Sequence, residues 1–190
     1  RAGDYLAVLP ENEPELVRRA AARFQLAPDD TVVVHRTRET SSLLPVDRPI
    51  TVGQLLGRFV ELKAPATRSD LRTLAANTPC PPEAQRLLAL AVDAANETDV
   101  LAKRVSILEL LERFASTALP FARFLELLPP MKPRRYSIAS SPLARDRRCA
   151  LAVAVLDAPA WSGTGRYRGT CSNHLAQLAP GATFFGSIVS

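Results

Sequence analysis

One stretch of the sequence, Arg134-Arg135-Tyr136-Ser137-Ile138-Ala139-Ser140-Ser141-Pro142, holds its densest run of chemically useful side chains. The pattern favours an extended strand, in which alternate residues share a face, so Arg134 and Tyr136 lie on the same side. A guanidinium fork suits a phosphate, and a tyrosine ring beside it can cover a planar aromatic ligand. Ser137 can hydrogen-bond a ring nitrogen through its hydroxyl or its backbone N–H. The same spacing also fits an ordinary edge strand with solvated arginines.

A second stretch, Gly169-Thr170-Cys171-Ser172-Asn173-His174-Leu175, runs from glycine through small polar residues into a helix-compatible pattern. It predicts a helix N-terminus, whose unpaired N–H groups and dipole attract phosphate. Ser172 can cap this helix or donate to phosphate, and a plain Ser-capped surface helix is the alternative. Together the two stretches suggest a pyrophosphate held between the helix end and Arg134. A nucleophilic Cys171 is the weaker hypothesis, because the sequence places no base near it beyond His174.

The elements that must position these residues fall into strands, a helical insert and strands again. Strands are predicted at residues 3–9, 31–35, 135–141, 149–156 and 183–189, with 31–35 beside the first strand. Residues 37–47 read as a loop, and residues 157–165 as a turn-rich connection. Helical periodicity dominates from residue 50 to residue 128.

Local signals mark where the helices begin. Asn12 is the predicted N-cap of a helix that carries Pro14 in its first turn. Capping boxes are predicted at Thr51 with Gln54 and at Ser106 with Glu109. Further helices are predicted to open at Ser69-Asp70, Pro81-Pro82 and Pro120.

Composition limits the classes of function. The 190 residues, 47% of them hydrophobic, suffice for one large or two small domains. The net charge of +5 is scattered and accompanied by no nucleic-acid recognition motif, so an anionic cofactor or partner explains it equally well. Three cysteines and two histidines lack the spacing of a zinc site, and no metal is expected. The cysteine usage fits a reducing compartment, for which we expect the cytoplasm.

The two ends of the sequence indicate an excerpt from a longer polypeptide. The sequence opens without methionine or signal peptide and stops within a strand-like pattern. No apolar run is long enough to span a membrane. We therefore expect further domains outside this stretch.

Motifs over nearly the whole chain resemble the FAD-binding region of the diflavin reductases. This family includes NADPH–cytochrome P-450 reductase, sulfite reductase flavoprotein and the reductase part of nitric oxide synthase. The resemblance is nearest to the reductase half of self-sufficient fatty-acid hydroxylases, in which a haem monooxygenase is fused to a diflavin reductase. The motifs are Gly3-Asp4-Tyr5-Leu6-Ala7-Val8, Val60-Glu61-Leu62, Pro65-Ala66-Thr67-Arg68, Cys80-Pro81-Pro82, Leu101-Ala102-Lys103-Arg104, Arg134-Arg135-Tyr136-Ser137, Trp161-Ser162-Gly163 and Gly169-Thr170-Cys171-Ser172-Asn173.

This resemblance implies an α+β fold. It would be an antiparallel β-barrel of the ferredoxin-reductase FAD-binding type with an inserted all-helical connecting subdomain. The barrel would comprise residues 1–36 and 130–190 and be incomplete at both ends. The helical subdomain would comprise residues 37–129.

The resemblance also implies roles for individual residues. Arg134 would contact the FAD pyrophosphate, Tyr136 would stack on the isoalloxazine ring, and Ser137 would act as the catalytic residue that assists hydride transfer. Arg104 would reach the cofactor from the helical insert. Contacts along the flavin and its ribityl chain would come from Leu151, Ala152 and Val153, and the pyrophosphate would be held by Gly169, Thr170, Cys171 and Ser172. Two positions depart from the family pattern, since Cys171 replaces a usual small residue and His174 a common aromatic.

In the intact protein the resemblance implies hydride transfer from NADPH to FAD, then electron transfer to FMN and on to a haem monooxygenase, fused or separate. The partners would be the FMN and NADPH-binding domains of the same polypeptide. Neither domain is in this sequence, so the stretch alone should not turn over. The competing hypothesis is a non-catalytic helical protein-interaction module with a small β-domain.

Overall fold

The computed structural model describes residues 4–35, 44–141 and 148–189. Its backbone contacts divide the chain into two compact units. The β unit comprises Arg1–Glu11, Met131–Ala158 and Arg166–Ser190, and the helical unit comprises Asn12–Pro130 and Pro159–Gly165. This division groups residues 12–36 with the helices, whereas the sequence-based boundary placed them with the strands.

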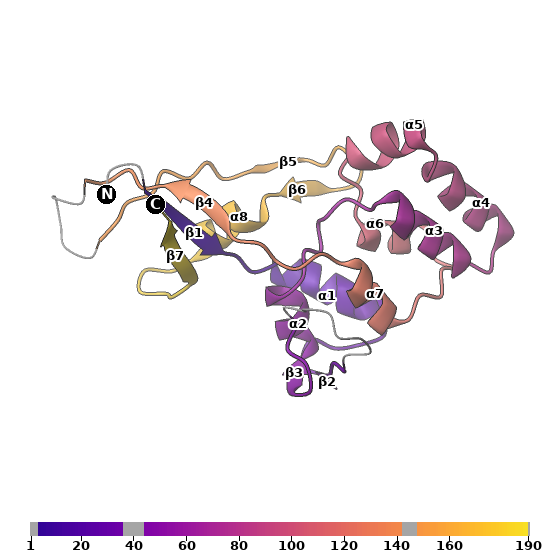
Figure 1. Cartoon of the computed structure of the whole chain (residues 1–190), viewed down its shortest axis with the longest axis horizontal. Coiled ribbons are helices and arrows are strands. Elements are labelled where there is room, and N and C mark those ends of the chain that lie inside the picture. Colours follow the sequence, from indigo (N-terminus) through magenta and orange to yellow (C-terminus); the bar gives the residue numbers. More distant parts are fainter. Residues whose placement is uncertain (1–3, 36–43, 142–147, 190) are drawn as a thin grey trace. The chain divides into compact units, whose positions relative to one another are not determined.

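A three-stranded antiparallel sheet is the centre of the β unit. Strand β1 (Tyr5–Leu9) lies between β4 (Arg134–Ser137) and β7 (Phe185–Val189), as Figure 1 shows. Leu6 is opposite Tyr136 on one side and Ile188 on the other. All three strands of this sheet were predicted, although β4 is shorter than predicted and Pro142 lies outside the described residues.

Residues 149–156 do not form the continuous strand that the sequence analysis predicted. They make a single antiparallel bridge, between Leu151 and Ile138, with Ala139 N donating to Ala150 O at 2.8 Å. The next strand is instead β5 (Asp157–Pro159), which pairs with β6 (Arg166–Arg168) where a turn-rich connection was predicted. A strand persists only while a neighbour supplies a hydrogen-bonding ladder, and the neighbouring partner here ends after two residues.

The described strands form one three-stranded and two two-stranded sheets. The mixed α+β class with antiparallel pairing is confirmed. These sheets do not close into a barrel within the described residues.

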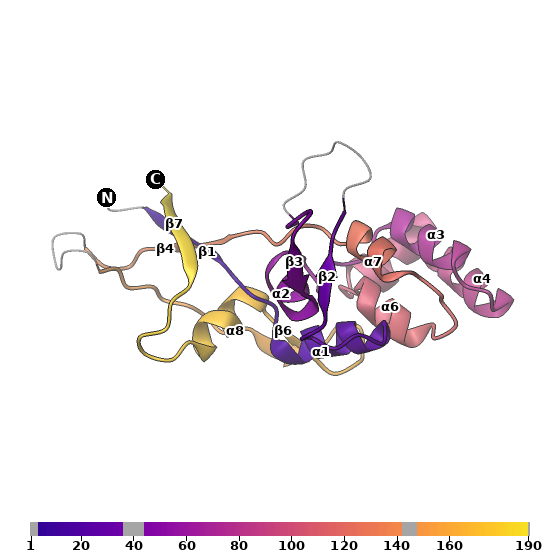
Figure 2. The ribbon, with the colours of Figure 1, turned by 90° about the horizontal axis from the view of Figure 1, so that it is seen from below.

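The helical unit contains nearly all of the hydrophobic core. Its buried side chains are mostly leucine, valine and alanine, and the ring of Phe24 packs against those of Phe121 and Phe124. Helices α3 and α4 pack side by side, as both ribbon views show (Figures 1 and 2). The elements are α1 (Pro14–Arg23), β2 (Thr31–Val33), β3 (Pro49–Thr51), α2 (Val52–Arg58), α3 (Arg68–Ala76), α4 (Pro81–Leu90), α5 (Asp93–Ala95), the π-helix η1 (Asn96–Leu101), α6 (Ile107–Arg113) and α7 (Phe121–Leu127).

Helix starts in this unit follow local sequence signals closely. Ser106 and Glu109 form the predicted reciprocal capping box of α6. Thr51 accepts a hydrogen bond from Gln54 N at the start of α2. Helix α3 begins at a further capping box, formed by Thr67 with Asp70, which the sequence analysis missed.

Two expectations about the start of the chain were wrong. The N-cap of α1 is Glu13, and the Asn12 side chain instead donates to the carbonyls of Leu56 and Val60, each at 2.7 Å. Strand β2 pairs with β3, which is close in sequence, and not with β1. Most of the predicted loop at residues 37–47 lies outside the described residues. Among the helices described, none combines the length and apolar character needed to cross a membrane.

Candidate functional site

Strand β4 presents two different faces, as its sequence predicted. Arg134 and Tyr136 are half-buried on one face, whereas Arg135 and Ser137 are exposed on the other. Arg134 lies opposite the fully buried Val8 of β1. Its Nη1 atom donates to the carbonyl of Lys132 at 2.6 Å, which holds the start of the strand.

The backbone of Ser137 is directed toward the edge of the sheet. Ile138 N donates to Asp4 O at 3.1 Å, which makes Asp4 and Ile138 a hydrogen-bonded pair in the antiparallel ladder. Such pairs alternate with pairs that exchange no hydrogen bonds, so the Ser137 N–H points away from β1. Because β4 is the outer strand on this side, the Ser137 peptide faces outward.

Helix α8 (Thr170–Gln177) begins with Gly169 as its N-cap. The first hydrogen bond within the helix runs from Asn173 N to Gly169 O at 3.0 Å. The N–H groups of Thr170, Cys171 and Ser172 therefore have no acceptor within the helix. The residues of this first turn, Thr170 to Asn173, are themselves buried.

Tyr136 and Cys171 bring the strand and the helix end together. The Tyr136 hydroxyl hydrogen-bonds the Cys171 thiol. Burial raises the pKa of Tyr136 well above its ordinary value, and the bond to Cys171 raises it further. The positive charge of Arg134 acts on the Tyr136 pKa in the opposite direction, so that guanidinium is also close. Both stretches that the sequence singled out therefore meet within the β unit.

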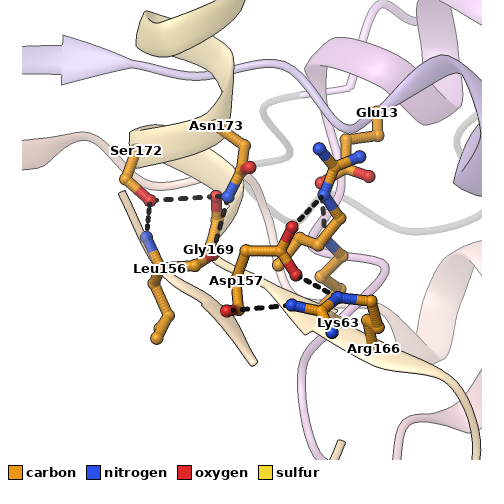
Figure 3. A network of polar contacts seen from close by, with 9 residues as sticks. Glu13, Lys63, Leu156, Asp157, Arg166, Gly169, Ser172 and Asn173 are labelled. Atoms are coloured by element: carbon orange, nitrogen blue, oxygen red, sulfur yellow. Dashed lines mark hydrogen bonds and ion pairs between the residues drawn. The ribbon is translucent and has the colours of Figure 1, made fainter. Parts of the chain in front are cut away.

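A second set of contacts fixes the loop before α8 (Figure 3). Ser172 Oγ accepts from Leu156 N at 3.2 Å and donates to Gly169 O at 3.3 Å. The Asn173 Nδ2 atom donates to Leu156 O at 2.8 Å and to Gly169 O at 3.0 Å. Gly169 N also donates to Leu156 O at 2.8 Å.

These contacts limit what Ser172 can offer an anion. Its hydroxyl has one hydrogen, and that hydrogen is directed at Gly169 O. Phosphate oxygens require donors, so in this arrangement Ser172 would contribute its backbone N–H and not its hydroxyl. Gly169 has its own steric constraint, because a Cβ there would lie 2.8 Å from Ser172 Oγ and 3.1 Å from Leu156 Cβ.

An acidic residue and two arginines support the strands next to this loop. Arg166 Nε donates to Asp157 Oδ1 at 2.6 Å, and its Nη2 donates to Asp157 O at 3.2 Å. Arg168 Nε lies 3.5 Å from Asp157 Oδ2. The sequence analysis did not identify these residues, because the ion pairs depend on the unpredicted pairing of β5 with β6.

The remaining predicted site residues lie in two places. Leu151 bridges Ile138 just beyond the end of β4, with Ala152 and Val153 directly after it. Arg104 is in the helical unit, where it is exposed and has a φ of 55° just after η1. The described residues contain no group of three or more histidine, cysteine or acidic side chains that could hold a metal ion.

The donors around Tyr136 fit a flavin dinucleotide. The helix end supplies backbone N–H groups and Arg134 supplies a guanidinium, and both kinds of donor match the oxygens of a pyrophosphate. The aromatic ring of Tyr136 suits a planar ring system.

Comparison with known proteins identifies the family to which the chain belongs. Residues 1–174 match the family described as "FAD binding domain". The chain is 43% identical over 179 residues to "Bifunctional cytochrome P450/NADPH--P450 reductase 1" of Bacillus subtilis (strain 168), an alignment that covers 94% of this chain and 17% of the relative. It is 45% identical over 180 residues to "Self-sufficient cytochrome P450 monooxygenase CYP505U2" of Exserohilum turcicum, covering 95% of this chain and 17% of the relative.

The similarity extends to a further fungal protein and is confined to one part of each relative. "Self-sufficient cytochrome P450 monooxygenase CYP505E4" of Penicillium freii is 41% identical over 189 residues, which is 98% of this chain and 17% of the relative. The chain thus spans about a sixth of the length of these relatives. On the match over residues 1–174, the chain belongs to the family described as "FAD binding domain".

Proposed function

We propose that the β unit holds FAD between β4 and the N-terminus of α8. The observation that carries this proposal is the hydrogen bond between Tyr136 and Cys171, which joins the predicted ring platform to the predicted phosphate segment. Family membership supports the choice of FAD over other dinucleotides. In this proposal Arg134 and the N–H groups of residues 170–172 bind the pyrophosphate.

The other residues take roles along the flavin. The Tyr136 ring packs on the isoalloxazine, and the outward Ser137 peptide and hydroxyl hydrogen-bond its reactive edge. Leu151, Ala152 and Val153 line the flavin and ribityl side. An antiparallel β-barrel of the ferredoxin-reductase FAD-binding type, incomplete at both ends, belongs to the same proposal, supported by the antiparallel sheet of β4, β1 and β7.

The chemistry follows from the cofactor and from how the chain holds it. When bound, FAD supplies two-electron exchange with NADPH and one-electron exchange with other redox centres. The chain contributes a half-buried face at Tyr136 that limits water access, and a hydrogen-bonding group at Ser137 that orients the ring. Arg134 and the helix dipole offset the negative charge of the pyrophosphate.

For the intact protein we propose an NADPH-dependent diflavin reductase. Electrons would pass from NADPH through FAD to FMN and then to a haem monooxygenase, with the FMN and NADPH-binding domains on the same polypeptide. The names of the relatives, which join a cytochrome P450 to an NADPH–P450 reductase, support this assignment. A cytoplasmic location is part of the proposal, and the thiols of Cys80, Cys149 and Cys171, which form no disulfide, fit it.

Mutation of both faces of β4 tests the site. The double substitution Arg134→Ala and Tyr136→Ala should weaken FAD binding by roughly a hundredfold, since it removes a charge-assisted contact and a stacked ring. Arg135→Ala is the matched control, because Arg135 lies on the same strand with its side chain on the opposite face. Binding is read from flavin absorbance near about 380 and 450 nm and from fluorescence quenching. A protein that takes up no FAD, or a double variant that binds as the control does, would show the assignment to be wrong.

A further inference from the structure

Asn173 is the most deeply buried polar residue of the first turn of α8, with an exposed fraction of 3%. Its single Nδ2 atom donates to two backbone carbonyls, Leu156 O at 2.8 Å and Gly169 O at 3.0 Å. One carbonyl belongs to the N-cap of its own helix. The other belongs to a residue 17 positions earlier, at the end of the segment that follows the Leu151 bridge. The carboxamide therefore cross-links two backbone segments at the helix end (Figure 3).

The two carbonyls do not depend on Asn173 for their hydrogen bonds. Leu156 O also accepts from Gly169 N, and Gly169 O also accepts from Asn173 N. A carbonyl oxygen has two lone pairs, so each would keep a partner after loss of the carboxamide. Removing the side chain consequently loosens the geometry of the loop more than it exposes unsatisfied groups.

We propose that Asn173 is a positioning residue for the cofactor pyrophosphate. By fixing the Gly169 peptide against Leu156, it sets the direction of the N–H groups of residues 170–172 without contacting the cofactor itself. The same bond ties residues 151–156 to the helix end, so one side chain aligns both backbone segments of the site. This inference rests on the proposed FAD site.

The steric setting of Gly169 supports this role. A Cβ at Gly169 would clash with Ser172 Oγ, so the Gly169 peptide packs closely against the first turn of α8. When the N–H donors are already ordered, binding of the anion does not include the entropic cost of ordering them. Loss of the cross-link should therefore weaken binding of the anionic cofactor by roughly tenfold or more.

The test compares Asn173→Ala, Asn173→Asp and the control Asn77→Ala in the full chain. Asn77 is matched because its Nδ2 also donates to a backbone carbonyl, that of Thr73 at 2.8 Å, but within the helical unit. FAD affinity is measured by fluorescence quenching, and amide exchange of Gly169 is measured by NMR without FAD. Asn173→Ala should weaken FAD binding about tenfold and accelerate Gly169 exchange, whereas Asn77→Ala should change neither.

The aspartate variant separates positioning from general destabilisation. Its carboxylate would face two carbonyl oxygens, which raises the pKa of the new side chain. Protonation then restores one O–H donor, so the FAD affinity of Asn173→Asp should rise as the pH falls from about 8 to about 5. The affinity of Asn173→Ala should stay flat over the same range.

The outcomes discriminate this inference from the proposed function. Wild-type chain that fails to bind FAD overturns the proposed function, and the exchange measurement then still reports whether Asn173 fixes the loop. Unchanged Gly169 exchange in Asn173→Ala overturns the positioning role. Wild-type FAD affinity in Asn173→Ala, or an Asn173→Asp affinity that does not respond to pH, overturns it as well.

Discussion

Replacement of Gly169 by alanine should disrupt the helix end on steric grounds. The φ of Gly169 is −62°, which alanine adopts readily, so backbone strain plays no part. The added Cβ would lie 2.8 Å from Ser172 Oγ and 3.1 Å from Leu156 Cβ. Ser172 must then move, which breaks its 3.2 Å hydrogen bond from Leu156 N. Overpacking of this kind costs about 1–3 kcal/mol, and loss of a glycine N-cap adds about 0.5–1 kcal/mol.

The assay is equilibrium urea denaturation of Gly169→Ala beside the control Gly57→Ala. A Cβ at Gly57, in α2, would meet no atom within 4 Å, so alanine there should stabilise the helical unit slightly. Gly169→Ala should lose about 2–4 kcal/mol in the transition of the β unit and bind FAD more weakly. If it unfolds at the wild-type midpoint and binds FAD normally, the close contacts at the helix end do not carry the energy assigned to them.

Three further predictions concern individual contacts. Ser106→Ala should destabilise the helical unit by about 1 kcal/mol through loss of the α6 capping box, measured by urea denaturation; no change would contradict the cap. Asp157→Asn should cost less than about 1 kcal/mol, because the side chains of its arginine partners are 59% and 41% exposed, and the loss should shrink in salt. Folding raises the pKa of Tyr136 above the value of about 10 that it has in the unfolded chain. The contribution of the neutral phenol to stability is therefore complete below about pH 10 and should be lost as the pH rises above that value. Tyr136→Phe should remove that part of the alkaline destabilisation; an unchanged profile would contradict the buried phenol.

Elements with local signals were predictable from the sequence. The α6 start depends on Ser106 and Glu109, three residues apart, and the α4 start depends on adjacent prolines at positions 81 and 82. The strand-like apolar pattern that ends at residue 189 correctly predicted strand β7. Each of these signals lies within the element it defines.

The features that sequence reasoning missed depend on distant partners. Residues 149–156 have a strand composition, but among the described residues their strand-like pairing is limited to the Leu151–Ile138 bridge and the hydrogen bond from Ala139 N to Ala150 O. Asn12 was predicted to be a helix N-cap, but its side-chain amide donates hydrogen bonds to backbone carbonyls more than 40 residues away in the sequence. For Asn173, the bond to Gly169 follows a local side-chain-to-backbone pattern, whereas the bond to Leu156 has no sequence signal.

The central claim is that the N-terminus of α8 binds the FAD pyrophosphate. Amide chemical shifts of the ¹⁵N-labelled chain, followed during titration with FAD, test it most directly. The account predicts saturable shifts that are largest at Thr170, Cys171 and Ser172, whose N–H groups have no acceptor within the helix. Shifts that are absent at these amides, or that concentrate in the helical unit, would contradict it.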